Sequence, residues 1–346
     1  METVKKSIAE IIIAGKNVTG DVGRYLSKIT YNDRLEYESD DISLSFEDTS
    51  GKWQGTWYPQ QGDSLKVKVG DTGGMLDCGL FVIDEIELNF PPDILTVKGI
   101  AASVMKSLRT KNSKAFEEQT LRDIASYFAD KYKLKIVGNT GNLQKIEIER
   151  KTQDRQTDLS FLATLAKEYG IIFSVRGGWM IFLEVEDLER RDPILTIPRS
   201  AMSRARFRDK TSEIYIGAVI HKRNAGKNDT SKWSIITGEE GEGDLLVIDT
   251  DAENGEQARA QGKAALKNKV KEKYSGSITV PGNVKLVSGV NINLTGIGQF
   301  SGKWLIVSSS HSVEPSGGYT TSLDVHKVVT VSEKIYKSEF YQIPTV

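Results

Sequence analysis

The chain has 346 residues, which is too long for one ordinary hydrophobic core, so two or three domains are expected. Charged residues make up 27% of the sequence and hydrophobic residues 38%, proportions that are ordinary for a globular protein in water. A formal net charge of -1 gives no overall basic field, so the composition argues against specific nucleic-acid recognition. No apolar run approaches the ~20 residues that a transmembrane helix needs, so membrane insertion is not expected.

The residue types that usually hold metals or act as nucleophiles are scarce. Cys78 is the only cysteine, which excludes an intramolecular disulfide and a thiolate zinc site. The three histidines, His221, His311 and His326, are far apart and show neither HxH nor HExxH spacing. No GxxxxGK[ST] sequence occurs, and the glycine-rich stretch 70–79 is predicted to be a turn, because no helix follows it. We therefore expect no cofactor and no metal site.

The first hundred residues show the period-two alternation of β-strands. Apolar residues alternate with polar ones across 29–46, and again in the segments 62–70 and 79–90. The last of these predicts a strand with a bend near Asp84, followed by a turn at the Pro-Pro-Asp sequence 91–93. Closely spaced strands with Gly and Pro turns between them predict a small barrel or sandwich.

The stretch 29–48 concentrates carboxylates and raises the question of a metal or catalytic site. Its acidic residues are Asp33, Glu36, Glu38, Asp40, Asp41, Glu47 and Asp48. An EF-hand calcium loop needs a central glycine and a glutamate at its twelfth position, and this stretch lacks both the glycine and the register. On a strand, Asp41 and Glu47 would lie on the opposite face from Ile42 and Phe46. We therefore predict that the carboxylates form the solvated face of a strand and the turn before it.

The middle of the chain changes from period two to helical spacing. A first helix is expected after Thr120, which forms a near capping box with Asp123, since the apolar residues that follow recur on one helix face. A second helix is expected to begin near Thr157 or Asp158 and to end at Gly170. The expected β-segments of this unit are a strand at 145–150 and a hairpin at 171–184, with its turn at Gly177-Gly178.

From about residue 204 the chain returns to alternating strands. They are predicted at 213–223, 231–236, 274–280, 284–296, 302–313 and 318–328. The acidic, glycine-rich segment 237–244 is predicted to be a solvated loop. The glycine-bounded strands 62–70 and 79–87 resemble 288–296 and 302–310, which makes duplication of one barrel the economical explanation.

These segments predict a mainly-β α+β protein in which two related β-barrel domains flank an α+β middle domain. The predicted units are an N-terminal barrel at 1–106, the middle domain at 107–187, a second barrel at 188–330 with a helix at about 252–274, and a C-terminal tail at 331–346.

Other groups with catalytic potential have simpler structural explanations. A carboxylate pair for glycoside hydrolysis could come from Glu117, Glu118, Glu147 and Glu149. None of them sits in a recognisable motif. Composition does not exclude a Ser-His-Asp triad, but Ser310-His311 and the pair Asp324 and His326 lie within predicted strands, without a nucleophile elbow. A hydrogen-bonded strand histidine is one of the open interpretations of His311. The basic segment 203–210 is predicted to be a solvated strand face. No catalytic residue is predicted, and the chain is not expected to be an enzyme.

The order of the segments resembles that of a known family. The ordered segments are "DDISLSFED", "GLFVIDEIE", "PPDILTVKG", the linker "SLRTKNSKAFEEQTLRDIA", "TDLSFLATLAKEYG" and the hairpin "GGWMIFLE". This series resembles the phage late control gene D protein family, the baseplate hub proteins of contractile phage tails. The segment "GQFSGKWLIVSSSHSVEPSGGYTTSLDVHK" is similar to the last barrel of that family. The resemblance covers roughly 5–330 and is most specific at 79–125 and 302–327.

The resemblance implies a structural protein that assembles as a homotrimer. Two related barrels in each of three chains would give a ring of pseudo-sixfold symmetry, which matches a hexameric tail tube on one side and a trimeric central spike on the other. The implied partners are therefore the tail tube protein, the spike and other baseplate proteins. The implied location is the virion or tail particle, assembled in the host cytoplasm.

The last residues suggest a further contact. The sequence ends soon after the last predicted barrel without a glycine-rich β-helical spike, so the spike is expected to be a separate chain. The tail 331–346 is expected to dock on spike or tube, or to fold back on its own barrel, through Ile335, Tyr336, Phe340 and Tyr341. A cell-wall hydrolase and a peptidoglycan-binding module remain alternatives for the middle domain.

Overall fold

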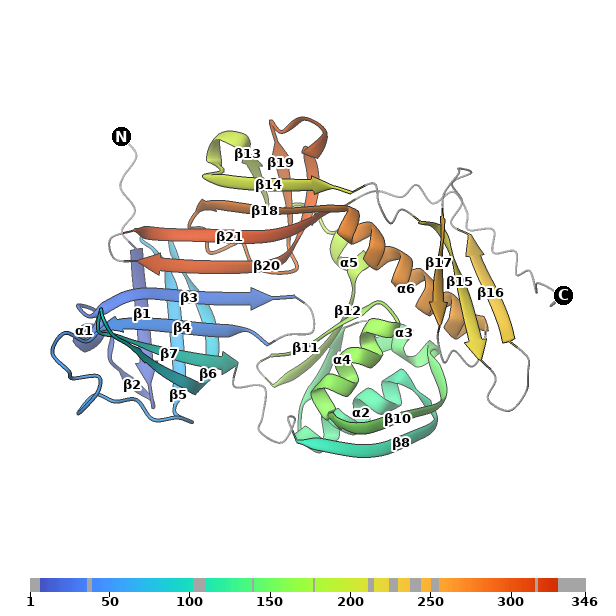
Figure 1. Ribbon diagram of the computed structural model, residues 1–346, viewed down its shortest axis with the longest axis horizontal. Coiled ribbons are helices and arrows are strands. Elements are labelled where there is room, and N and C mark those ends of the chain that lie inside the picture. The colour runs from blue at the N-terminus through green and yellow to red at the C-terminus, as the bar shows by residue number, and fades with distance from the viewer. Residues whose placement is uncertain are drawn as a thin grey trace.

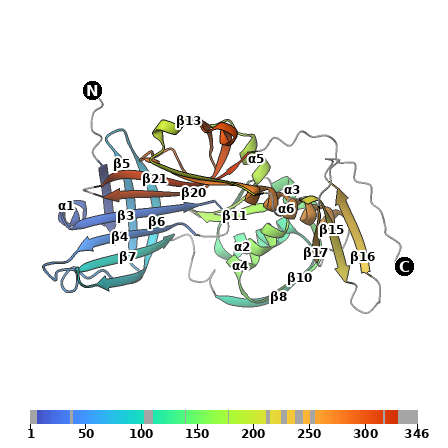
Figure 2. The same cartoon turned by 45° about the horizontal axis from the view of Figure 1, so that its top comes forward.

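The structure is a computed structural model. It describes residues 7–35, 39–101, 110–138, 140–176, 178–210, 215–223, 230–236, 244–249, 255–314 and 317–328. Figure 1 shows a large sheet at one end, an α+β unit beside it, and a long helix, α6, leading to a small sheet at the other end. The turned view in Figure 2 keeps this arrangement. Most elements are strands in antiparallel sheets, so the predicted mainly-β α+β fold is confirmed.

One 13-stranded sheet contains both of the predicted β-regions. Its N-terminal strands are β1 Ser7–Ile13, β2 Lys16–Asn17, β3 Leu26–Arg34, β4 Asp41–Glu47, β5 Ser64–Asp71, β6 Gly74–Asn89 and β7 Ile94–Ala101. Its C-terminal strands are β13 Leu195–Pro198, β14 Arg204–Asp209, β18 Tyr274–Pro281, β19 Asn291–Thr295, β20 Gly302–Glu314 and β21 Gly318–Lys327. Three short helical turns accompany them, α1 Thr19–Val22, η2 Arg199–Ala201 and η3 Gly298–Phe300.

The two β-regions meet where β3 pairs with β20. This antiparallel pairing gives the continuous order β14-β18-β21-β20-β3-β4-β7-β6-β5-β1-β2, with β19 and then β13 joined beside β20. Each region keeps its own hydrophobic core, one around Phe46 and Phe81 and the other around Trp304. The molecule therefore has two β-lobes on one sheet, called here the N-terminal and C-terminal lobes.

Period-two alternation places the core side chains in the N-terminal lobe. Ile42, Leu44 and Phe46 are all 1% exposed or less, as the sequence predicts. Burying each side chain of this size contributes roughly 1.5–3 kcal/mol. The predicted bend in β6 is also present, since its register against β7 shifts between Ile83 and Glu85. A bulge of this kind bends a long strand while the strand continues on both sides of it.

The α+β unit contains the two predicted helices and the predicted hairpin. Its elements are β8 Lys111–Thr120, α2 Leu121–Tyr132, β9 Lys135–Gly138, α3 Thr140–Lys145, β10 Glu147–Thr157, α4 Asp158–Glu168, β11 Ile171–Arg176, β12 Trp179–Glu184 and α5 Val185–Arg190. Thr120 and Asp123 form a complete capping box at the start of α2. Gly170 has a φ of +70° after α4, which is the left-handed conformation that ends a helix without strain in glycine.

Three segments differ from their predictions. Within the predicted linker 107–125, residues 111–120 form strand β8, which pairs with β10. The sequence shows no strand pattern there, because Phe116 is the one large apolar residue of β8. The predicted strand 284–296 is reduced to β19. Strand β17, Asp244–Asp249, was not predicted and begins at the last residue of the predicted acidic loop 237–244. The rest of that loop lies outside the described residues.

A small sheet of three strands, in addition to the two sheets β10-β8 and β11-β12-β9 of the α+β unit, completes the described structure. It contains β15 Tyr215–Arg223, β16 Thr230–Ile236 and β17, in the order β16-β15-β17. Helix α6, Gly255–Lys273, matches the helix predicted at about 252–274 and contacts β15, β16 and α4.

Candidate functional site

The acidic stretch 29–48 does not form a single solvated face. Ile42 and Phe46 point into the core while Asp41 and Glu47 lie opposite, as predicted. However, Asp33, Asp40 and Asp48 are 2%, 7% and 2% exposed, so the prediction that the carboxylates are solvated was wrong for these three. Glu36 and Glu38 lie outside the described residues. Asp48 accepts hydrogen bonds from the backbone N–H groups of Trp53 and Gln54, at 3.0 and 3.1 Å, and so shapes the loop after β4.

Asp33 and Asp40 share a cation that comes from the α+β unit. Arg176, the last residue of β11, places its Nη2 2.9 Å from Asp33 Oδ1 and 3.0 Å from Asp40 Oδ1. The same nitrogen donates to the backbone carbonyl of Arg34. Asp33 also accepts two 2.7 Å hydrogen bonds from the N–H and hydroxyl of Ser288. This Arg176 cluster ties β3, the turn before β4, the loop before β19 and the α+β unit together.

Burial sets the electrostatics of the Arg176 cluster. It raises the pKa of Asp40 to about 6, because the desolvated carboxylate is costly even though Arg176 and the N–H of Arg34 oppose the shift. Burial works against the charge of Arg176, yet Asp40 and Asp33 outweigh it and raise the pKa of the guanidinium. Burial also raises the pKa of Tyr31, whose hydroxyl lies 3.4 Å from Asp40 Oδ2. Arg176 therefore stays charged and Asp40 titrates near neutral pH.

A small apolar contact accompanies the Arg176 cluster. Leu35 at the end of β3 and Leu305 on β20 pack with Ile172, Val185 and Leu188. These residues come from both β-lobes and from the α+β unit, so the cluster belongs to an interface inside the chain. The arrangement is suited to holding these three parts of the chain in a fixed relation.

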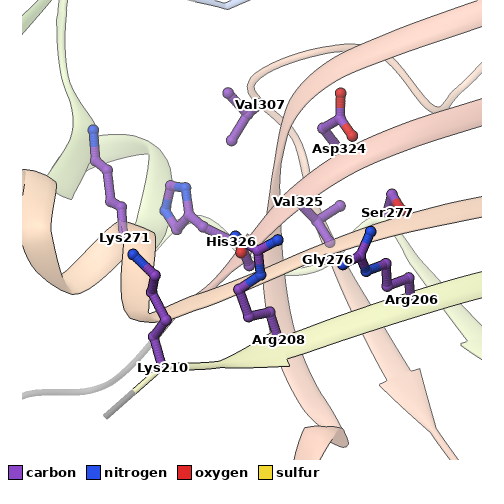
Figure 3. A pocket seen from close by; sticks show the side chains of 11 residues that line it. Arg206, Arg208, Lys210, Lys271, Gly276, Ser277, Val307, Asp324, Val325 and His326 are labelled. Carbon is purple, nitrogen blue, oxygen red and sulfur yellow. The ribbon is translucent and has the colours of Figure 1, made fainter. Parts of the chain in front are cut away.

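A basic hollow lies on the C-terminal lobe, where β14, β18, β21 and the end of α6 meet (Figure 3). Its volume is about 540 Å³. We call it the basic trough, and define it by the cationic side chains Arg206, Arg208, Lys210 and Lys271 and by the floor residues Ser275 and Ser277. The exposure of Arg206 and Arg208 agrees with the solvated face predicted for 203–210.

Strand register explains the shape of the basic trough. Its cross-strand rows are Arg206–Ser277–Asp324 and Arg208–Ser275–His326. Small serines on the middle strand leave space between the arginines on one side and Asp324 and His326 on the other. Gly276 sits between the two serines, and a Cβ there would lie 2.7 Å from the ring of Phe207. The sequence pattern Ser-Gly-Ser therefore forms the floor and admits Phe207 beneath it.

His311 and His326 both have partners within the fold. His311 is buried between β3 and β21, with Nδ1 2.7 Å from the hydroxyl of Tyr319 and Nε2 3.1 Å from the carbonyl of Leu286. Burial lowers the pKa of His311 to about 4. His326 Nε2 lies 2.9 Å from Glu189 Oε1. The interpretation of His311 as a hydrogen-bonded strand histidine agrees with these contacts.

The four candidate glutamates lie on two paired strands, β8 and β10. Glu117, Glu118, Glu147 and Glu149 are exposed on β8 and β10, and Glu117 lies 3.5 Å from Arg150. Within the ranges that the structure describes, no group of three or more His, Cys, Asp or Glu side chains is arranged to hold a metal ion. None of the described helices has the length and hydropathy needed to span a bilayer. The predicted contact residues Ile335, Tyr336, Phe340 and Tyr341 lie outside the described residues.

Sequence comparison finds two similar phage proteins. No family model matches the sequence. The probable baseplate hub proteins of Escherichia phages 186 and P2 are 26% and 27% identical to it over 228 residues, which is 64% of this chain. The chain is therefore similar in sequence to probable baseplate hub proteins of two phages. The resemblance to hub proteins seen in the ordered segments is thereby confirmed. The chain spans about half the length of these curated relatives, since the alignment covers 55% of each.

Solved structures share the fold of this chain. The 43 kDa tail protein of prophage MuSo2 from Shewanella oneidensis has a TM-score of 0.71 at 18% identity, covering 93% of this chain and 99% of that one. A tail protein from Neisseria meningitidis MC58 has a TM-score of 0.70 at 12% identity, with 93% and 97% covered. An E. coli component of the type VI secretion system has a TM-score of 0.56 at 12% identity, with 92% and 76% covered. At these identities the likeness shows the fold alone.

Proposed function

We propose that this chain is a structural baseplate hub protein of a contractile tail or a related injection device, and that it performs no catalysis. Its homology to the phage 186 and P2 proteins supports this function. The folds shared with tail proteins and with a type VI secretion component point the same way. The proposed location of the chain is the virion or tail particle, which is assembled in the host cytoplasm.

The pairing of β3 with β20 carries the proposal. It sets two β-lobes with separate cores side by side on one sheet, so that three chains would supply six lobes to a ring. Such a ring is pseudo-sixfold toward a hexameric tail tube and threefold toward a trimeric central spike. The domain limits 1–106, 107–187, 188–330 and 331–346 are part of this proposal.

The proposed partners are the tail tube, the central spike and other baseplate proteins. The tail residues Ile335, Tyr336, Phe340 and Tyr341 remain the proposed docking contacts, because they gather four apolar or aromatic residues within one short segment of the sequence. The rigid interface around Arg176 supports a scaffold role, since it fixes the α+β unit to the lobes that would form the ring.

The mass of the full chain in solution tests the proposal. Light scattering is expected to give three times the 38.3 kDa chain mass for the chain alone, or three chains plus the bound spike after addition of the spike protein. A chain that stays monomeric in both conditions would contradict the hub. Incubation with purified cell walls is the control for catalysis: release of soluble wall fragments by the chain would contradict the non-enzymatic role.

A further inference from the structure

We propose that the basic trough binds an extended acidic segment of a separate tail or baseplate protein, which lies across the sheet face with a carboxylate at every second residue. The inference rests on the proposed function for the source of this partner, and deepens it by naming the surface and the chemistry of the contact. Binding of such a segment does not require the homotrimer, so the two proposals can fail separately.

The cations of the trough form a regular row along one strand. The sequence reads RARFRDK from Arg204 onward, so basic residues occupy every second position. Arg204, Arg206 and Arg208 belong to β14 and therefore project from the same face of the sheet. Figure 3 shows Arg206 and Arg208 on the same side of the strand. Lys210 continues the row, since its N–H bonds the carbonyl of Lys273 at 3.0 Å. Neighbouring positions in the row are about 6.8 Å apart along the strand.

The fold holds this row in place. Phe207, which points to the opposite face of β14, stacks on Phe300 at 5.4 Å and packs against Trp304 at 5.3 Å between ring centroids. The two floor serines on the neighbouring strand β18 are small and leave the space above β18 open to a ligand. The spacing of the cations is therefore set before a ligand arrives, which lowers the cost of ordering the site on binding.

The charge of the row selects an anionic occupant. Within the part of the chain that the structure describes, Arg204, Arg206 and Arg208 make no salt bridge and no side-chain hydrogen bond. Among the described residues that line the hollow, Asp324 is the one carboxylate, and it accepts a 2.8 Å hydrogen bond from Ser308. Asp324 lies two strands from β14, about 10 Å across the sheet. A hollow lined mainly by one sign of charge concentrates its field on the opposite sign, so an anion should lie toward β14, away from Asp324.

The spacing and the lining of the trough favour a protein segment over a nucleic acid. An extended chain also repeats every two residues at about 6.8 Å, so carboxylates at alternate positions would meet successive cations of the row. Each arginine can bind such a carboxylate with both prongs of its guanidinium. A single-stranded nucleic acid carries regular charge as well, but proteins bind it by stacking its bases on aromatic side chains. None of the described residues that line the trough is Phe, Tyr or Trp.

The described strands of this chain do not supply the matching segment. None of them carries acidic residues at three alternate positions. The sequence has this spacing at Glu240, Glu242 and Asp244, and Asp244 begins β17 in the small sheet. Helix α6 has 19 residues, spans about 28 Å, and lies between the small sheet and the C-terminal lobe (Figure 1). The trough is therefore assigned to a separate protein.

Two synthetic peptides of identical composition test the spacing. One alternates Glu and Thr over eight residues, and the other carries its four Glu before its four Thr. The alternating peptide is expected to bind the full chain at least about tenfold more tightly, because the other peptide directs its carboxylates to both faces of an extended segment. Fluorescence anisotropy of the labelled peptides measures both dissociation constants. Equal affinities, or no binding of either peptide at low salt, would overturn the proposal.

Variants of the chain locate the peptide in the trough. Arg206→Gln/Arg208→Gln should weaken binding of the alternating peptide at least about tenfold, because two arginine–carboxylate contacts are lost. The control Arg24→Gln/Arg122→Gln removes the same charge at two exposed arginines of other elements and should bind as the wild type does. Ser277→Leu keeps every cation but fills the floor, and should also weaken binding. Circular dichroism verifies that each variant folds. Equal losses in the two arginine variants, or full affinity in Ser277→Leu, would overturn the site.

Two other occupants have their own arms in the experiment. An octamer of thymidine nucleotides that competes more strongly than the alternating peptide would assign the trough to nucleic acid. Glu240→Gln/Glu242→Gln should leave the affinity for the alternating peptide unchanged, and a gain would show that a segment of this chain occupies the trough. Either result overturns the assignment to a separate protein while the hub proposal stands. A chain that binds the peptide but stays monomeric, with and without spike protein, would overturn the homotrimer and leave the trough site in place.

Discussion

Arg176 shows how one side chain can fix the relation between distant segments. It lies 136 residues after Asp40 in the chain, yet its guanidinium joins Asp40 and Asp33 and caps the carbonyl of Arg34. A buried carboxylate is costly without a partner, so the two aspartates depend on this cation. The forked geometry of arginine allows it to serve several acceptors at once.

The titration of Asp40 gives a prediction at this scale. Its pKa of about 6 in the folded chain exceeds the ordinary 3.8, so the stability it contributes is complete below pH 3.8 and is lost as pH rises through 6. The Asp40→Asn substitution should remove the contribution of this carboxyl to the pH dependence of stability. Between pH 4 and 7, the free energy of unfolding of the wild type should fall relative to the variant by roughly 3 kcal/mol. Urea unfolding at several pH values measures both curves.

Asp41→Asn is the matched control for Asp40→Asn, since its carboxylate is only half-buried beside Arg34. The difference between wild type and Asp40→Asn should change with pH much more than the difference between wild type and Asp41→Asn. Parallel curves for the wild type and Asp40→Asn would show that the Asp40 carboxyl does not titrate in this range.

At the scale of single elements, α2 depends on its capping box. The Thr120 hydroxyl accepts the N–H of Asp123 at 3.2 Å, and the Asp123 carboxylate accepts the N–H of Thr120 at 3.0 Å. Thr120→Ala should reduce the free energy of unfolding by about 1 kcal/mol, because an N–H group of the first turn loses its acceptor. Urea unfolding measures the loss. Ser160→Ala, at an exposed position in α4, should change it by less than about 0.5 kcal/mol, and an equal loss in both variants would refute the capping contribution.

Local signals in the sequence were sufficient for some elements and insufficient for others. The capping box, the bend near Asp84 and the alternation of Ile42 to Phe46 depend on neighbours in sequence, and each prediction was confirmed. Strand β8 carries no alternation, and its place is set by pairing with β10. The burial of Asp33 depends on Arg176, which no spacing rule connects to it. Non-local pairing is the part of the fold that sequence patterns do not contain.

At the scale of the whole molecule, the seam between the β-lobes depends on a buried, neutral histidine. β20 pairs with β3 and β21, and His311 on it packs between Tyr31 and Tyr319 at ring distances of 6.1 and 5.9 Å. Asp33 is the nearby charged group that favours its protonation, and burial outweighs it, which lowers the pKa of His311 to about 4. Asp40 and His311 therefore lie close to the same seam, and their titrations change the free energy of unfolding in opposite directions.

His311 gives a prediction for the pH response of the entire chain. Its folded pKa lies below the ordinary 6.5, so the stability it contributes is complete above pH 6.5 and is lost as pH falls through about 4. Asp40 changes stability in the opposite direction over nearly the same range. The two effects, each about 3 kcal/mol, should largely cancel, leaving the free energy of unfolding of the wild type nearly independent of these groups between pH 4 and 6.5.

Single substitutions should expose the two opposed contributions. His311→Gln should become more stable on acidification from pH 6.5 to 4, because the Asp40 effect then acts alone. Asp40→Asn should become less stable over the same interval, and the double variant should lose both dependences. Urea unfolding of the four proteins at matched pH measures the slopes. Equal slopes for the two single variants would rule out cancellation at the seam, since each should depart from the wild type in its own direction.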